Sequence, residues 1–120
     1  MGYTKIKGIV SNPRRTEVKE IEFLVDTGAG YTVIPPIIAK ELGLEYIMKT
    51  KVVLANKTEV EVDYSSAYIK VLDREAPIPV LIVDSPMPLL GALTLQTLGL
   101  EVDPAKEEVR PSRPFALGLL

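Results

Sequence analysis

Residues 23–33 read Phe23-Leu24-Val25-Asp26-Thr27-Gly28-Ala29-Gly30-Tyr31-Thr32-Val33, and this stretch is the most informative in the chain. An apolar run ends at the carboxylate of Asp26, and a hydroxyl, a glycine and further small residues follow. Burying a carboxylate is costly unless its charge is hydrogen-bonded or shared. A buried strand that delivers Asp26 onto a tight turn therefore predicts a catalytic group. The alternative is an ordinary hairpin turn, in which the Asp side chain caps its own backbone.

A second segment strengthens the catalytic interpretation. Residues 88–99 read Pro-Leu-Leu-Gly-Ala-Leu-Thr-Leu-Gln-Thr-Leu-Gly. With the Asp-Thr-Gly-Ala loop at 26–29, this segment resembles the active-site elements of the retropepsin-like aspartic proteases, in the family's order. The similarity extends from Thr16 to Arg110. It implies an all-β fold: a closed acid-protease barrel with two short helices and a flap hairpin, working as a homodimer.

Composition narrows the possible chemistry. The chain has 120 residues, enough for one domain with a real core but too few for two lobes. A net charge of −2 gives no reason to expect nucleic acid or an anionic membrane as a partner. The absence of Cys and His removes thiolate nucleophiles, Ser-His dyads and the commonest metal ligands, so we expect no metal or cofactor. A positioned Asp is the strongest remaining candidate for hydrolysis.

The sequence also predicts a cytoplasmic protein that does not cross a membrane. No apolar segment approaches the roughly 20 residues that span a bilayer. The first residues, Met-Gly-Tyr-Thr-Lys-Ile, lack the apolar core of a signal peptide, and Ile6 does not fit a myristoylation motif.

The alternation of apolar and polar residues, interrupted by turn residues, predicts the order of the strands and helices. We expect strands over 3–10, 17–25, 51–55, 58–62 and 79–83, with a hairpin tip at Asn56-Lys57. Residues 68–72 are expected to continue the strand that begins at 58, and a turn over 73–77 follows. Two short helices are expected over 37–42 and 91–98, stopped by Gly43 and Gly99. Residues 1–110 would form the protease domain, and residues 111–120 an apolar C-terminal tail.

The two halves of the chain also repeat one plan. Leu24-Val25-Asp26, a turn, a helix and Leu42-Gly43-Leu44-Glu45 correspond to Ile82-Val83-Asp84, a turn, a helix and Leu98-Gly99-Leu100-Glu101. Each half is expected to be strand, turn, helix, strand. Coincidence is the alternative, because Leu-Gly-Leu is common at helix ends.

Peptide hydrolysis without a metal or a covalent intermediate needs a water molecule between two carboxyl groups, one ionised and one protonated. Asp84 occupies the echoed position, but Ser-Pro follows it, without a glycine and with one donor amide fewer. We therefore expect Asp84 to cap the following turn. The second carboxylate would be Asp26 of a second copy, since a residue beside a twofold axis meets its own equivalent.

The resemblance assigns roles to individual residues. It implies that Asp26 is catalytic, that Thr27 bonds across to the partner's loop, that Gly28 lets the loops approach, and that Ala29 leaves room for the substrate backbone. Gly30 is expected to bind substrate. The flap-tip residues Ala55, Asn56, Lys57 and Thr58 are also expected to bind substrate.

The sequence differs from the family's pattern in two places, and some of the residue roles implied by the resemblance are therefore less secure. Retroviral members often have Asp at the place of Gly30 and Arg at the place of Ala92, and these two residues pair. Losing both together is coherent, because neither leaves an unpaired charge, and it suggests a cellular rather than a viral type. The flap tip is not glycine-rich here, so its mobility and substrate contacts transfer poorly. Tyr31, Tyr64 and Tyr68 are interpreted as packing residues rather than as acid–base groups.

The function predicted is that of an aspartic endopeptidase acting on peptide or protein substrates. One alternative is a non-proteolytic module of the same fold that binds extended peptides or mediates assembly. Another is a glycosidase-like carboxylate pair, but no acid pairs with Asp26 at a recognisable spacing. The family implies that terminal strands interleave in the dimer, here residues 3–10 and 107–110. The apolar tail is expected at the dimer interface, the alternative being that it covers its own subunit's core.

Overall fold

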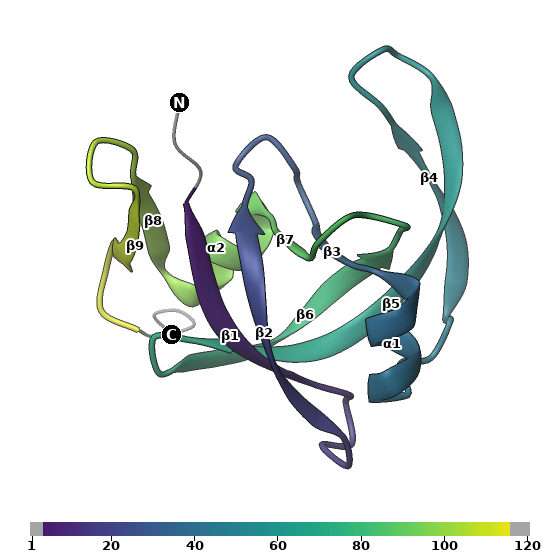
Figure 1. Cartoon of the computed structure of the whole chain (residues 1–120), viewed down its shortest axis with the longest axis horizontal. Coiled ribbons are helices and arrows are strands. Elements are labelled where there is room, and N and C mark those ends of the chain that lie inside the picture. The colour runs from purple at the N-terminus through teal and green to yellow at the C-terminus, as the bar shows by residue number, and fades with distance from the viewer. Residues whose placement is uncertain (1–3, 116–120) are drawn as a thin grey trace, which may run out of the picture.

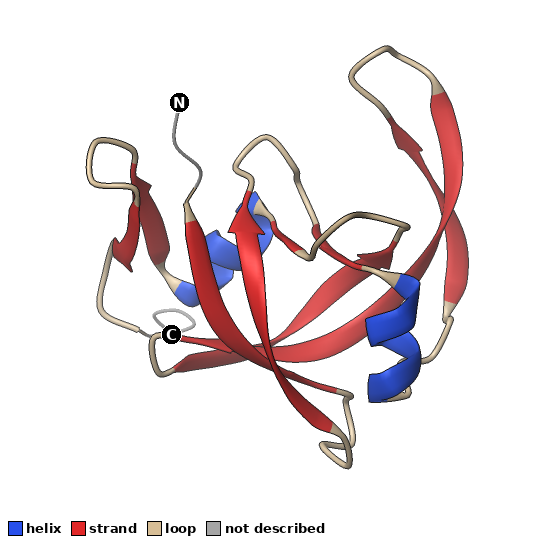
Figure 2. Cartoon of the chain, viewed as in Figure 1, coloured by secondary structure: helices blue, strands red, loops and turns tan. Residues whose placement is uncertain are grey.

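Strands make up most of the molecule. The computed structural model describes residues 4–115 (Figure 1). In chain order its elements are β1 (Lys5–Ser11), β2 (Val18–Val25), β3 (Thr32–Ile34), α1 (Pro36–Leu42), β4 (Met48–Val53), β5 (Glu59–Val71), β6 (Arg74–Ile82), β7 (Leu89–Leu90), α2 (Ala92–Leu98), β8 (Leu100–Asp103) and β9 (Glu108–Pro111). Two short helices accompany the strands (Figure 2), which confirms the predicted all-β class with two helices.

The main sheet closes on itself. Its strands follow the order β1-β2-β7-β3-β6-β5-β4, and β1 pairs in addition with β5. On one side Gly8 lies opposite Ile21 of β2, and on the other Val10 lies opposite Ile69 of β5. Six strands therefore form a closed barrel, and β4 is attached outside it as an edge strand. Closure removes exposed sheet edges from the barrel, and it confirms the predicted barrel.

The barrel encloses one apolar core. Val10, Phe23, Ile34, Leu90 and Leu98 are fully buried and come from three strands near the N-terminus and the β7–α2 region. Inward-facing residues alternate with exposed ones along β1 and β2, as expected for strands with one wet face. β2 and β6, the strands that lead into the loops at 26–31 and 83–88, both contribute residues to this core.

The expected internal repeat is visible in the topology. β2 pairs in parallel with β7, β6 pairs in parallel with β3, and the two short strands meet where Val33 lies opposite Leu89. Both helices have seven residues, and each ends at a left-handed glycine, Gly43 with φ 68° and Gly99 with φ 67°. Only the second half has a strand directly after its helix; the first continues irregularly to Met48.

The predicted flap hairpin is formed by β4 and the first half of β5. These strands pair from Met48 opposite Tyr64 to Val53 opposite Glu59, and the hairpin projects away from the barrel (Figure 1). An ion pair of 2.9 Å between Lys49 and Asp63 joins the two strands. The hydrogen bond to Asp63 raises the pKa of the Lys49 ammonium, as expected when a carboxylate favours the charged form.

The predicted turn over residues 73–77 is wrong. β5 and β6 are joined at Leu72 and Asp73, with φ values of 51° and 63°, and β6 begins already at Arg74. Two successive left-handed residues give a turn whose twist suits the flanking strands. The predicted strand over 79–83 is therefore the end of a longer strand. β3 and β7 were not predicted, because strands of three and two residues show no period.

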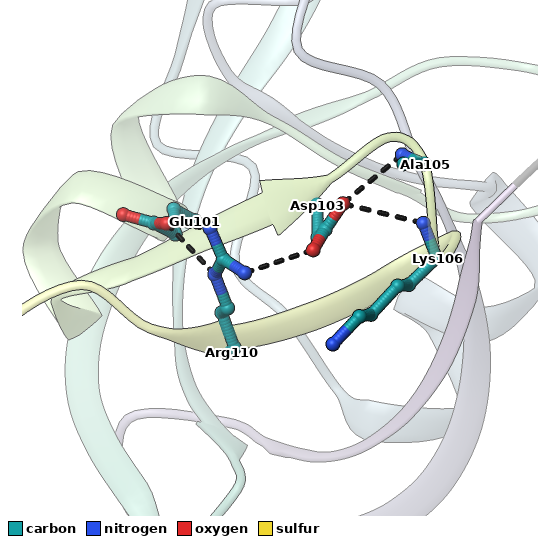
Figure 3. Close-up of polar contacts among 5 residues, drawn as sticks. All are labelled: Glu101, Asp103, Ala105, Lys106 and Arg110. Atoms are coloured by element: carbon teal, nitrogen blue, oxygen red, sulfur yellow. Dashed lines mark hydrogen bonds and ion pairs between the residues drawn. The ribbon is translucent and has the colours of Figure 1, made fainter.

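The C-terminal hairpin of β8 and β9 is joined by charges on its exposed face. Arg110 of β9 pairs with Glu101 and with Asp103 of β8, both at 2.8 Å (Figure 3). The Asp103 carboxylate also accepts hydrogen bonds from the backbone N–H groups of Ala105 and Lys106, which closes the turn. The predicted strand over 107–110 thus pairs within its own chain, and its pairing with a second subunit stays a prediction.

The first part of the tail contacts its own subunit. The N–H of Ser112 donates to the carbonyl of Gly99 at 2.8 Å, and the Arg113 guanidinium donates to the carbonyl of Gln96 at 3.0 Å, at the C-terminal end of α2. Residues 116–120 lie outside the described residues, so the predicted place of the tail at a dimer interface is not tested. Neither of the helices described within residues 4–115 has the length and hydropathy of a membrane-spanning segment.

Candidate active site

The Asp26 loop is shaped by its own backbone hydrogen bonds. The N–H of Asp26 donates to the carbonyl of Leu90 at 3.0 Å, and its carbonyl accepts the N–H of Ala29 at 3.1 Å. The N–H of Gly28 donates to Asp26 Oδ1 at 3.0 Å, which orients the half-buried carboxylate. The loop joins β2 to β3, which do not pair with each other. It is therefore not an ordinary hairpin turn, although Asp26 does cap its own loop.

The start of α2 holds this loop from the other half of the chain. The N–H of Ala92 donates to the carbonyl of Ala29 at 2.8 Å, and the N–H of Leu93 donates to the carbonyl of Gly30 at 3.0 Å. Backbone amides at a helix start lack partners within the helix. Here they are satisfied by the loop, so the two motifs noted in the sequence are brought together in one structure.

A buried pair of hydroxyls fastens the end of the loop. Thr32 Oγ1 and Thr94 Oγ1 lie 2.6 Å apart, and Thr32 Oγ1 also accepts the N–H of Gly91 at 3.1 Å. Both threonine residues are 0% exposed. A Cβ on Gly91 would lie 2.5 Å from the carbonyl carbon and oxygen of Tyr31, so only glycine fits there. None of these roles of Thr32, Thr94 and Gly91 was predicted from the sequence. The one signal for them in the sequence is a threonine within each of two apolar segments.

An open cleft of about 590 Å³ lies between the Asp26 loop and the flap hairpin. The residues that line it are Gly28, Ala29, Gly30, Tyr31, Val33, Lys51, Val52, Val53, Leu54, Val60, Val62, Leu81, Val83, Asp84, Ser85, Pro86 and Leu89. Three predicted site residues, Gly28 to Gly30, thus border the cleft, and Asp26 is hydrogen-bonded to the first of them. The lining is mainly aliphatic, as in most ligand sites.

The flap tip is placed differently. Ala55, Asn56, Lys57 and Thr58 are exposed and do not line the cleft within the described chain. The flap contributes its strands instead, through Lys51 to Leu54 and through Val60 and Val62. The predicted substrate contacts of the tip residues stay a prediction. Thr27 is exposed as well, with no side-chain hydrogen bond inside residues 4–115.

Two expectations about single residues are corrected. Tyr31 is 42% exposed and borders the cleft, so it is not a packing residue as predicted. Asp84 does not cap the turn after it, since its side chain makes no hydrogen bond within residues 4–115. That turn is held instead by the Ser85 hydroxyl, which donates to the carbonyl of Met87 at 2.7 Å. At Gly30, an added Cβ would meet no atom within 4 Å. Lack of space therefore does not explain the absence of the family's Asp there.

No trio of acidic side chains within residues 4–115 comes together in a way that could hold a metal ion. The site consists of one oriented carboxylate, that of Asp26, beside an apolar cleft that the edge strand β4 helps to line.

A closed barrel with a projecting hairpin and an Asp-Thr-Gly loop beside the cleft is the arrangement of the retropepsin-like class of fold. The chain belongs to the aspartyl protease family, whose sequence model matches residues 6–106. The fold is similar to that of the EIAV protease, solved as a complex with the inhibitor HBY-793, with a TM-score of 0.65. That match covers 85% of this chain and 93% of the viral chain at 23% identity, so it bears on the fold alone. No curated protein matches the sequence.

Proposed function

We propose that the protein is an aspartic endopeptidase that works as a homodimer, with Asp26 of each subunit forming one catalytic pair. One observation carries this proposal: Asp26 is oriented by the N–H of Gly28 on a loop clamped by α2, beside an apolar cleft that a peptide can enter. Membership in the aspartyl protease family supports it.

A second copy of the chain is needed because one chain supplies only one of the two carboxyl groups. Asp26 accepts a hydrogen bond from a backbone amide, but it pairs with no second carboxylate among the described residues. Asp84 lies on the β6–β7 loop. This loop has no glycine, and it lacks the hydrogen bonds from the start of α2 that hold the Asp26 loop. A twofold axis beside Asp26 supplies the missing group from the partner. The exposed Thr27 side chain would then be free to bond across to the partner's loop.

The chemistry proposed is direct attack by water. Two carboxyl groups in contact cannot both ionise, so they share one proton. The ionised group removes a proton from the water, and the protonated group donates a hydrogen bond to the scissile carbonyl oxygen. The water oxygen bonds to the carbonyl carbon while the carbonyl oxygen takes the proton of the protonated carboxyl group. The C–N bond then breaks as the amine takes the proton that had been removed from the water, and the re-forming carbonyl returns its proton to the carboxylate pair.

The flap supplies a place for the substrate backbone. β4 is the last strand of the sheet order, so one of its edges is unpaired within the described chain. An extended peptide can add to such an edge as a further strand, with its side chains directed alternately into pockets. Val52, Val53 and Leu54 line the cleft next to this edge. We propose that apolar substrate side chains beside the cut bind there, with Gly30 and the flap tip contacting the backbone.

Cleavage of a peptide library tests this function with a matched pair of variants. Asp26→Asn removes the ionisable group and nearly keeps its shape. Asp73→Asn makes the same chemical change in the exposed β5–β6 turn, where the left-handed φ of 63° suits Asn. We expect the first variant to fold and to cleave nothing, and the second to cleave like the wild type. Full activity in folded Asp26→Asn protein would overturn the proposal. Binding without cleavage by the wild type would favour the non-proteolytic module.

A further inference from the structure

The cleft carries two charged side chains on facing elements. Among the described residues that line it, only Lys51 of β4 and Asp84 of the β6–β7 loop are charged, and the rest are mainly aliphatic. Neither takes part in an ion pair within residues 4–115, although Lys49 and Asp63 of the same flap do. A charge left unpaired beside an apolar cleft can discriminate between ligands, because a like charge brought against it is disfavoured.

Asp84 is the more rigidly placed of the two. Directly before it, the N–H of Val83 donates to the carbonyl of Ile34, and after it the Ser85 hydroxyl donates to the carbonyl of Met87. The loop ends where the carbonyl of Pro88 accepts the N–H of Leu24 at 2.9 Å. Asp84 itself is exposed, and its carboxylate makes no hydrogen bond or ion pair within residues 4–115. Lys51 instead has a long side chain on the projecting flap, which loses more rotamer entropy when it binds.

We infer that Asp84 is a specificity-determining residue that selects peptides carrying a basic side chain beside an apolar centre. The apolar centre would occupy the aliphatic part of the cleft, and a Lys or Arg further along the peptide would pair with the Asp84 carboxylate. This inference rests on the proposed function. In the proposed homodimer Asp84 occurs twice, related by the same axis as Asp26, so the preference applies on both sides of the scissile bond.

Peptide binding tests this inference apart from cleavage. Fluorescence anisotropy is measured with Asp26→Asn protein, which leaves the peptides intact. The probes share an apolar centre and differ at one flanking residue, which is Lys, Gln or Glu. An exposed ion pair gives roughly a two- to fivefold gain in affinity, so we expect the Lys peptide to bind that much more tightly than the Gln peptide. The gain should shrink as salt is raised.

The matched variants assign the effect to one carboxylate. Asp84→Asn in the Asp26→Asn background should abolish the difference between the Lys and Gln peptides, while Asp73→Asn in the same background should preserve it. Equal binding of all three peptides, tighter binding of the Glu peptide, or a Lys preference that survives Asp84→Asn would each overturn the inference. Wild-type protein that binds the peptides with this preference but cleaves none of them would leave the Asp84 assignment standing and overturn the proteolytic function.

Discussion

The buried hydroxyl of Thr32 fastens the end of the Asp26 loop to the start of α2. Thr32→Val nearly keeps the shape of the side chain but removes Oγ1. The N–H of Gly91 and the hydroxyl of Thr94 then lose their partner, and both threonine side chains are fully buried. A buried polar group without a partner costs roughly 1–3 kcal/mol, so we expect the free energy of unfolding to fall by about 3 kcal/mol.

A double-mutant cycle separates this network from a simple loss of packing. Thr94→Val alone should cost about 1 kcal/mol, because Thr32 still accepts the N–H of Gly91. The double variant should be no less stable than Thr32→Val, since the hydroxyl of Thr94 left unpaired by the single change is then absent. Equilibrium urea unfolding measures all four proteins, at one fixed protein concentration in case subunits dissociate. A loss below about 1 kcal/mol for Thr32→Val, or two single losses that add in the double variant, would refute the reasoning.

Three further predictions concern the loop, the tail and the flap. Gly91→Ala should lower the melting temperature strongly or prevent folding, because its Cβ would lie 2.5 Å from the Tyr31 backbone. Gly30→Ala should leave the melting temperature unchanged, because its Cβ would meet no atom within 4 Å. Equal melting temperatures of the two variants would contradict this prediction. Cutting the chain after Arg110 should weaken dimerisation and activity together, and a truncated protein that sediments as a stable dimer and still cleaves peptides would count against the tail. A cross-link near Asn56 should slow turnover more than it shifts the melting temperature, and unchanged turnover would show that the hairpin is not a closing flap.

The features that could be predicted from the sequence are those set by local chemistry. The apolar run that ends at Asp26, the flap alternation, and the glycine stops at Gly43 and Gly99 each depend on a few adjacent residues. The left-handed φ values of both glycines, 68° and 67°, are the ones that a helix-ending glycine adopts. The pairing of the two motifs followed from the resemblance, and the closed barrel agrees with it.

The features that could not be predicted depend on contacts between distant parts of the chain. β3 and β7 are too short to show a period, and they exist because they pair with each other and with β6 and β2. Leu72 and Asp73 adopt left-handed conformations because the long β5–β6 hairpin requires a tight turn, which overrides local preference. Thr32 and Thr94 are 62 residues apart, so no local pattern joins them. Asp84 has the residue type of a turn cap, and only the fold shows that this residue borders the cleft.

The measurement that tests the central claim most directly is a mixing experiment between wild-type and Asp26→Asn chains. The two proteins are combined in varying ratios at constant total concentration, allowed to exchange subunits, and assayed for peptide cleavage. If one site needs Asp26 from both subunits, mixed dimers are inactive and activity falls with the square of the wild-type fraction, to about one quarter in an equimolar mixture. A linear fall, to about one half in that mixture, would mean that each chain carries its own complete site and would contradict the account.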